Sequence, residues 1–182
     1  MDKYEDNYSL LFQKWQHKKI ADSIASQIGC DAIRITSDSV QSTVDLEGYD
    51  LVFVGTGLFA GTPNEDIVWY LRNLNLKTSK LFALFLTWGG APITDKLALS
   101  RLKMLLESKG QKVLEDYFAC YGGWKGILMK RGHPKSEEIK ADGEWAKSSL
   151  MVWKNLYYNK KYPPRTNFYL ACKLISFFEI LV

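Results

Sequence analysis

The sequence predicts an α/β fold in which helices cover a parallel β-sheet. Two runs, residues 51–55 and 80–87, are apolar on both faces, which is typical of interior parallel strands. Each run leads into a glycine-containing loop and then into a helical pattern. Strands and helices that alternate at these lengths pair the strands in parallel through right-handed crossovers. The carboxyl ends of the strands therefore meet at one edge, where open α/β sheets bind their ligands.

The composition is that of one soluble globular domain with an ample core. The chain has 182 residues, of which 47% are hydrophobic and 24% charged. The formal net charge is +4, and the basic excess lies in the part that follows residue 124. A solvated basic face explains this excess better than an acidic partner, nucleic acid or an anionic lipid surface.

The cysteines and the first residues bear on the cell compartment and on metal binding. Cys30, Cys120 and Cys172 are far apart and form no CxxC motif, which argues against a zinc or iron–sulfur site. Unpaired cysteines suit a reducing cytoplasm. The start of the chain is polar and acidic, so it does not have the pattern of a signal peptide.

Secondary structure is predicted along most of the chain. Three isoleucines, Ile20, Ile24 and Ile28, mark one face of the first helix. Pro63 at a first helical position marks the start of the second helix, and Gly110 ends the third. Acidic residues suit the first turns of helices, as Glu65 and Asp66 do in the second. The predicted strands are residues 8–12, 31–35, 51–55, 80–87 and 112–120, and the predicted helices are residues 17–28, 63–74, 94–109 and 136–157.

The last residues differ from the rest, which divides the chain into a domain of residues 1–158 and a tail of residues 159–182. The tail begins with a basic, proline-containing linker and ends in a strongly apolar stretch, residues 168–182. This stretch is shorter than the roughly 20 residues that span a bilayer, and it contains Lys173 and Glu179. We expect an amphipathic helix that packs on its own domain, on a second copy in a homo-oligomer, or, less readily, on a membrane surface.

In three segments the sequence resembles the flavodoxin family. The segments are YDLVFVGTGLFAGTP, LFALFLTWGG and RGHPKSEEIKADGEWAK, within a similarity that covers roughly residues 8–150. The resemblance implies a flavodoxin-like three-layer sandwich whose five-stranded parallel sheet has the order 2-1-3-4-5. It also implies FMN as the cofactor and electron transfer as the activity.

Four loops are expected to meet at the carboxyl edge of this sheet. They bring together aromatic side chains and glycines, which suit the flat apolar slot that an isoalloxazine ring needs. By the resemblance, the loops after the third and fourth strands flank the ring, with Phe59 and Trp88 as the stacking contacts. The residues expected to bind FMN in these loops are Thr56, Gly57, Leu58, Phe59, Ala60, Gly61, Thr87, Trp88, Gly89, Gly90, Tyr121 and Trp124.

The first loop departs from the family pattern. Flavodoxins place small hydroxyl-bearing residues there, whose N–H groups and hydroxyls grip the phosphate at a helix N-terminus. This chain has no Gly, Ser or Thr in the loop, although Lys14, Lys18, Lys19 and His17 could supply charge instead. The residues expected near the phosphate are Gln13, Lys14, Trp15, Gln16, His17 and Lys18.

Three functions are open on the sequence. The first is an FMN-binding electron carrier that works with a redox partner protein or a nicotinamide-linked reductase, and no side chain then need act as an acid or base. The second is an FMN-dependent NAD(P)H or quinone reductase. The third is a flavodoxin-like interaction module that has lost FMN, which the first loop and the tail favour. His133 has the chemistry of a proton shuttle, but its place before Pro134 and a helix start favours a loop residue.

Overall fold

A computed structural model describes residues 17–35, 46–89, 93–122, 133–158 and 172–177. Its first helix comprises residues 17–28. The other elements, in chain order, are β1 (Asp31–Ile35), β2 (Leu51–Phe59), β3 (Thr62–Pro63), α2 (Glu65–Asn73), β4 (Leu81–Trp88), α3 (Thr94–Glu107), β5 (Lys112–Val113), β6 (Phe118–Tyr121), α4 (Ser136–Tyr158) and β7 (Cys172–Phe177).

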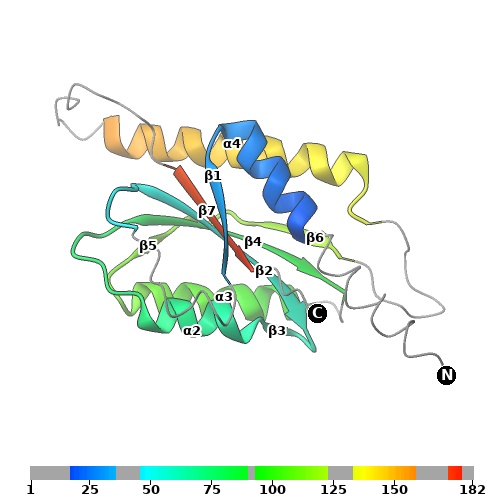
Figure 1. Ribbon diagram of the computed structural model, residues 1–182, viewed down its shortest axis with the longest axis horizontal. Helices are drawn as coiled ribbons and strands as arrows, with labels where there is room; N and C mark the ends of the chain where they lie inside the picture. Colours follow the sequence, from blue (N-terminus) through cyan, green and yellow to red (C-terminus); the bar gives the residue numbers. More distant parts are fainter. Residues whose placement is uncertain (1–16, 36–45, 90–92, 123–132, 159–171, 178–182) are drawn as a thin grey trace.

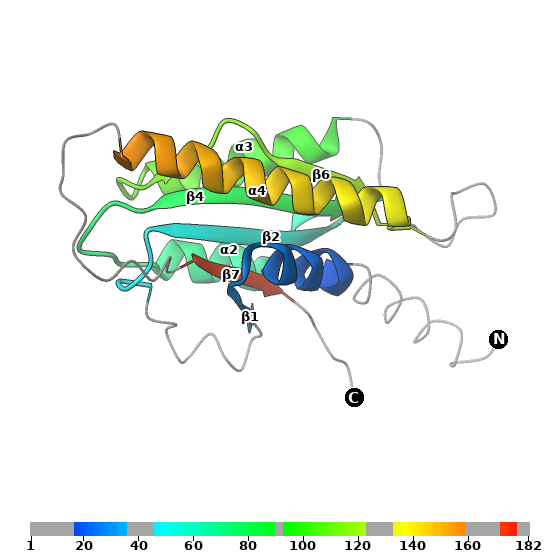
Figure 2. The ribbon, with the colours of Figure 1, turned by 90° about the horizontal axis from the view of Figure 1, so that it is seen from above.

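The elements form three layers, with the sheet between two pairs of helices. Helices α2 and α3 cover one face of the sheet, while helix 17–28 and α4 cover the other (Figures 1 and 2). Side chains of β2 alternate between the two cores: Val52 and Val54 pack toward α2 and α3, and Leu51 and Phe53 pack toward α4. A strand that is buried on both faces must be apolar throughout, as the sequence pattern predicts.

The sheet has a different strand order from the predicted one. In the described part of the chain it has seven strands. Five run in the order β1-β7-β2-β4-β5, β6 also pairs with β4, and β3 pairs with β2. All pairs are parallel except β2 with β3, which form an antiparallel hairpin. The fold class α/β is confirmed, but the predicted five-stranded, purely parallel sheet of order 2-1-3-4-5 is wrong in strand number, direction and order.

The C-terminal strand β7 causes the change in order. It lies between β1 and β2, coloured red in Figure 1, and pairs with both in parallel. The prediction of an amphipathic helix is therefore wrong for residues 172–177. The sequence CKLISF gives the physical reason, because β-branched and aromatic residues without helical spacing favour an interior strand. The predicted strand of residues 8–12 lies outside the described residues.

Most predicted elements recur with small shifts at their ends. The strand of residues 31–35 is β1, while β2 runs four residues beyond the predicted end because it continues into the hairpin with β3. The predicted strand of residues 112–120 is divided into β5 and β6, with charged Glu115 and Asp116 between them. No helix in the described ranges is long and apolar enough to cross a membrane.

Candidate functional site at the carboxyl edge of the sheet

The β2–β3 hairpin projects from the carboxyl edge of the sheet. Its turn is formed by Ala60 and Gly61, which both have positive φ angles, of 48° and 78°. Phe59 at the end of β2 is 70% exposed. Gly57 is open on its free side, since a Cβ atom there would meet only Thr87 Oγ1 at 3.7 Å. The hairpin therefore offers a ligand an exposed aromatic ring next to a bare stretch of backbone.

Thr56 holds this hairpin to the start of α2. Its buried hydroxyl donates to the Gly57 carbonyl at 3.0 Å and accepts from the Asn64 N–H at 3.1 Å. Asn64 in turn caps α2, because its side-chain oxygen accepts from the Asp66 N–H at 2.8 Å. The hydroxyl of Thr56 is thus used within the protein and fixes the shape of the edge.

The first glycine of the Gly55-Thr56-Gly57 sequence has a packing role. A Cβ atom at Gly55 would lie 2.0 Å from Phe85 Cζ, so only glycine lets the Phe85 ring lie against β2. The His17 ring then stacks on Phe85, with a centroid distance of 5.2 Å and an interplanar angle of 10°. Gly55 thereby allows the first described turn of helix 17–28 to sit on the sheet near its carboxyl edge.

His17 is neutral at neutral pH in this setting. The side chain is 2% exposed, and its Nδ1 lies 3.4 Å from Thr87 Oγ1. Burial lowers the pKa of His17 from 6.5 to about 4, although a hydrogen bond with the Gly55 backbone acts in the opposite direction. The exposed Lys18 pairs with Asp22 at 2.5 Å. His17 therefore packs the helix on the sheet and does not supply charge for a phosphate.

A row of aromatic rings lies along the other side of the edge, across β4 and β6. Trp88 pairs with Tyr121 in the parallel register, and their rings meet edge to face at 5.8 Å. Tyr121 contacts the His133 ring, also edge to face, at 5.5 Å. The Gly122 N–H donates to the Trp88 carbonyl at 2.6 Å, which extends the pairing past β6.

The structure places some of the expected FMN contacts close together and separates others. Gly57 and Thr87 are cross-strand partners. Phe59 and Trp88 belong to neighbouring strands but point to opposite faces of the sheet. Leu58 and Trp88 pack on the α2–α3 core, and Phe59, the next residue after Leu58 in β2, points to the other face. A ring held by both would lie beyond the strand ends. The other expected contacts, Gln13, Lys14, Trp15, Gln16, Gly90 and Trp124, lie outside the described residues.

Behind the edge, a buried carboxyl group joins helix 17–28 to α4. Asp142 is fully buried and accepts from Ser23 Oγ at 2.7 Å, while its Oδ2 has no hydrogen-bond partner in the described part of the chain. Burial raises the pKa of Asp142 from 3.8 to about 7, against hydrogen bonds from Ser23 and the Gly143 backbone. Burial also raises the pKa of the nearby Cys120 thiol, with smaller contributions from Glu138 and Asp142, so this thiol is not a nucleophile.

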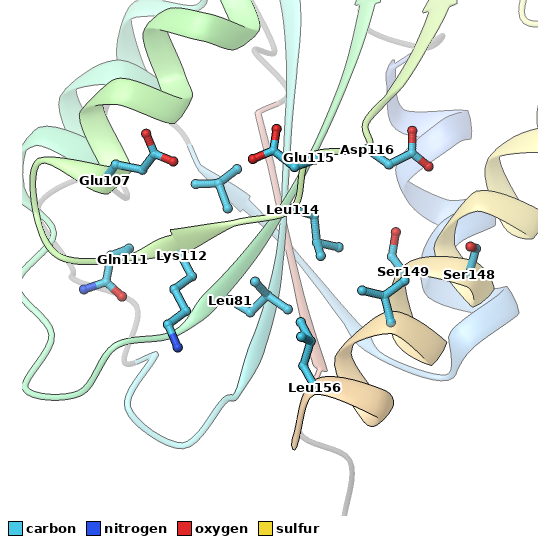
Figure 3. Close-up of a pocket in the computed structure, with 12 residues that line it drawn as sticks. Leu81, Glu107, Gln111, Lys112, Leu114, Glu115, Asp116, Ser148, Ser149 and Leu156 are labelled. Carbon is cyan, nitrogen blue, oxygen red and sulfur yellow. The ribbon is translucent and has the colours of Figure 1, made fainter. Parts of the chain in front are cut away.

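A pocket of about 570 Å³ lies elsewhere, between α4 and the β5–β6 connection (Figure 3). Leu81, the first residue of β4, lines it, so the pocket lies toward the amino ends of the strands. Leu114 and Leu156 line it with apolar side chains, and the exposed Glu115 and Asp116 line it as well. The carboxyl edge and this pocket are therefore two separate places where a ligand could bind.

Comparison with known proteins establishes a family relationship and a fold. No family model matches the chain. Uncharacterized protein MJ0298 of Methanocaldococcus jannaschii is 33% identical over 150 residues, which cover 78% of this chain and 96% of that protein. The chain belongs to the MJ0298 family. An archaeal flavodoxin structure matches this member of the MJ0298 family with a TM-score of 0.51 and 12% identity, over 76% of this chain and 91% of that one. At that identity the likeness shows the fold alone, and the fold is flavodoxin-like.

One pairing at the edge of this MJ0298-family protein has no counterpart among the sequence predictions. His133 Nδ1 lies 2.6 Å from Glu138 Oε2, and the same oxygen accepts from the Lys135 N–H at 2.6 Å. The sequence contained a sign of this contact. Glu138 is the third residue of α4, and a Glu at that position commonly accepts a hydrogen bond from the backbone N–H just before the helix. What the sequence could not show is that His133 is buried against Tyr121.

Proposed function

We propose that this protein binds FMN non-covalently at the carboxyl edge of its sheet and transfers electrons. The observation that carries the proposal is the β2–β3 hairpin, which presents the exposed Phe59 beside the open backbone of Gly57 on a flavodoxin-like sheet. The Phe59 ring is 70% exposed, so a flat ligand can stack on it and cover it.

The residues of the edge fit the isoalloxazine ring by their chemistry. Phe59 would cover one face of the ring, and Trp88, held by Tyr121, would contact it from the neighbouring strand. Such stacking contributes roughly 1–3 kcal/mol per contact. Bound FMN would supply the electron-accepting group, and an apolar slot would disfavour extra negative charge on it. That slot would lower the potential of the last reduction step.

The FMN phosphate would lie near the start of helix 17–28. Backbone N–H groups at a helix N-terminus attract anions, and the exposed Lys19, next to the Asp22-paired Lys18, adds positive charge in the first described turn. His17 does not contribute charge, because its pKa is about 4. Residues 13–16, which the sequence analysis expects near the phosphate, lie outside the described residues. A redox partner protein or a nicotinamide-linked reductase would supply the electrons.

Titration of the apoprotein with FMN, followed by flavin fluorescence, tests the proposal. We expect quenching with a dissociation constant of about 1 µM or tighter. Trp88→Ala should weaken binding by about tenfold if its stacking contributes ~1.4 kcal/mol. Trp69→Ala is the matched control, since Trp69 is 48% exposed on α2 and lines the groove between α2 and α3. Absence of binding at about 100 µM FMN would contradict the proposal and favour an interaction module without FMN.

A further inference from the structure

The outer side of helices α2 and α3 carries large apolar side chains that the fold leaves uncovered. Trp69 on α2 is 48% exposed, and Leu97 and Met104 on α3 are 58% and 67% exposed. The two helices lie below the sheet in Figure 1, and no other described element covers their outer side. Exposed apolar side chains that gather on one side of a protein are typical of an interaction surface.

A groove of about 570 Å³ lies between the two helices and connects these side chains. Trp69 lines the groove from α2, and Arg101 and Leu105 line it from α3. Arg101 is one helical turn away from both Leu97 and Met104, so the three share one side of α3. The groove and the exposed side chains therefore form one continuous area, which we call the α2–α3 surface.

The α2 side of the groove has opposite charges at its two ends. Four residues that line it, Glu65, Val68, Trp69 and Arg72, have the spacing i, i+3, i+4 and i+7 of a single helix face. Glu65 and Arg72 are exposed, and neither forms an ion pair with a described residue. They lie about 10 Å apart along the helix axis, with Trp69 close to the midpoint. The helix dipole accounts for the two charges but not for the exposed tryptophan between them.

This face is complementary to a second copy of itself. In a two-fold interface, a residue i of one protomer faces a residue j of its partner, and j faces i. If the two α2 helices run antiparallel, each Glu65 lies opposite the other protomer's Arg72, and both Trp69 side chains lie near the two-fold axis. The charged residues that line the groove are two acids and two arginines. Their charges cancel, so the surface favours neither an acidic nor a basic partner.

We propose that the α2–α3 surface binds a second copy of this chain, in a two-fold homodimer whose α2 helices pack antiparallel. Tryptophan and arginine contribute most to the affinity of many protein interfaces, and both are present on this surface. The dimer does not depend on FMN. Because Phe59 points to the other face of the sheet, the interface leaves the proposed flavin site open.

Sedimentation equilibrium of the full-length protein, over about 1–100 µM, measures the association. We expect the mass to rise from that of one chain toward that of two. Trp69→Ala should raise the dissociation constant of the dimer by about 30-fold or more, as truncation of a central interface tryptophan does. Met151→Ala is the matched control and should leave the constant unchanged, since Met151 is 63% exposed on α4, which covers the other face of the sheet.

Charge reversal tests the antiparallel arrangement. Glu65→Arg and Arg72→Glu each bring like charges together across the axis, so each should weaken the dimer by about tenfold. The double variant restores both opposite pairs, and its dissociation constant should return to within about threefold of the original. The double variant also has both charges reversed relative to the helix dipole. A loss of helix stability would therefore be greatest in the double variant and would not give this recovery.

The other outcomes overturn the proposal. A protein that is still monomeric at about 100 µM would leave the α2–α3 surface to a different protein. A dimer that Trp69→Ala does not weaken would have its interface elsewhere. A double variant that associates no better than the two single variants would exclude antiparallel α2 helices. Circular dichroism checks that each variant is folded, and if Trp69→Ala is not, the charge-reversal variants decide.

Discussion

At the scale of single residues, two glycines of β2 have different tasks although they stand two positions apart. Gly55 makes room for the Phe85 ring, because a Cβ atom at position 55 would lie only 2.0 Å from Phe85 Cζ. Gly57 has open space beside it. In the sequence, Gly55 ends the predicted strand and Gly57 belongs to the predicted ligand loop. The difference could not be predicted, because it depends on which strand lies next to β2 and in which register.

Alanine at each glycine separates stability from binding. Gly55→Ala should lower the free energy of unfolding by about 2–3 kcal/mol, since Phe85 is fully buried and cannot move aside. Gly57→Ala should change it by less than about 1 kcal/mol but weaken FMN by about tenfold, because its methyl group occupies the space of the ligand. Urea unfolding and flavin titration measure the two effects. The same stability loss in both variants would contradict this assignment.

Two buried titratable groups, His17 and Asp142, make the free energy of unfolding depend on pH, and their two contributions have opposite signs. The pKa of His17 is about 4 in the folded protein and 6.5 ordinarily, so the unfolded chain binds the extra proton and stability falls as pH drops from 6.5 to 4. The pKa of Asp142 is about 7 when folded and 3.8 ordinarily, so the folded chain binds the extra proton and stability falls as pH rises from 4 to 7.

Removal of either group should expose the effect of the other. Asp142→Asn leaves His17, so stability should rise between pH 4.5 and 6.5, values chosen inside the roughly two-unit window in which both groups act. His17→Gln leaves Asp142, so stability should fall over the same interval. Urea midpoints at the two pH values measure both slopes. Equal slopes in the two variants would contradict the pKa shifts.

At the scale of elements, the strands and helices follow from local pattern, and their order in the sheet does not. The apolar runs that become β1, β2 and β4 were found to within a residue at their starts, because burial on both faces leaves a clear signal. The tail is equally apolar, but its pattern predicts a helix where the structure has strand β7. Its partners, β1 and β2, lie more than a hundred residues earlier, and no local pattern states which strands will pair.

A proline in β7 tests whether this strand lies inside the sheet. Ile175 pairs with Ile33 of β1 and Val54 of β2, so Ile175→Pro removes an interior N–H and should cost about 3 kcal/mol or more. Val113→Pro in edge strand β5 is the control. The N–H groups of Lys112 and Leu114 donate to the Lys80 and Phe82 carbonyls, so the Val113 N–H points away from the sheet.

Thermal unfolding of the two proline variants gives the comparison. We expect a large loss of melting temperature for Ile175→Pro and a small one for Val113→Pro. If Ile175→Pro has the same melting temperature as the unchanged protein, β7 is not an interior strand, and a helical tail becomes the better description.

At the scale of the whole molecule, the sheet has two ends with different chemistry. The carboxyl edge holds the hairpin with Phe59, the Trp88–Tyr121 contact and the His133–Glu138 pair. The opposite end holds the pocket between α4 and the β5–β6 connection, which apolar side chains and the acidic Glu115 and Asp116 line (Figure 3). The sequence predicted the first, since the carboxyl ends of parallel strands must meet, and gave no sign of the second, which depends on how α4 packs.

Hydrogen exchange with and without FMN tests most directly whether the carboxyl edge is the flavin site. We predict that FMN slows exchange in residues 56–61, in residues 87–89 and in the first turn of helix 17–28, and leaves residues 111–116 and 148–156 unchanged. Slower exchange around the pocket of residues 111–116 and 148–156, with none at the hairpin, would contradict the account and move the ligand to the other end of the sheet.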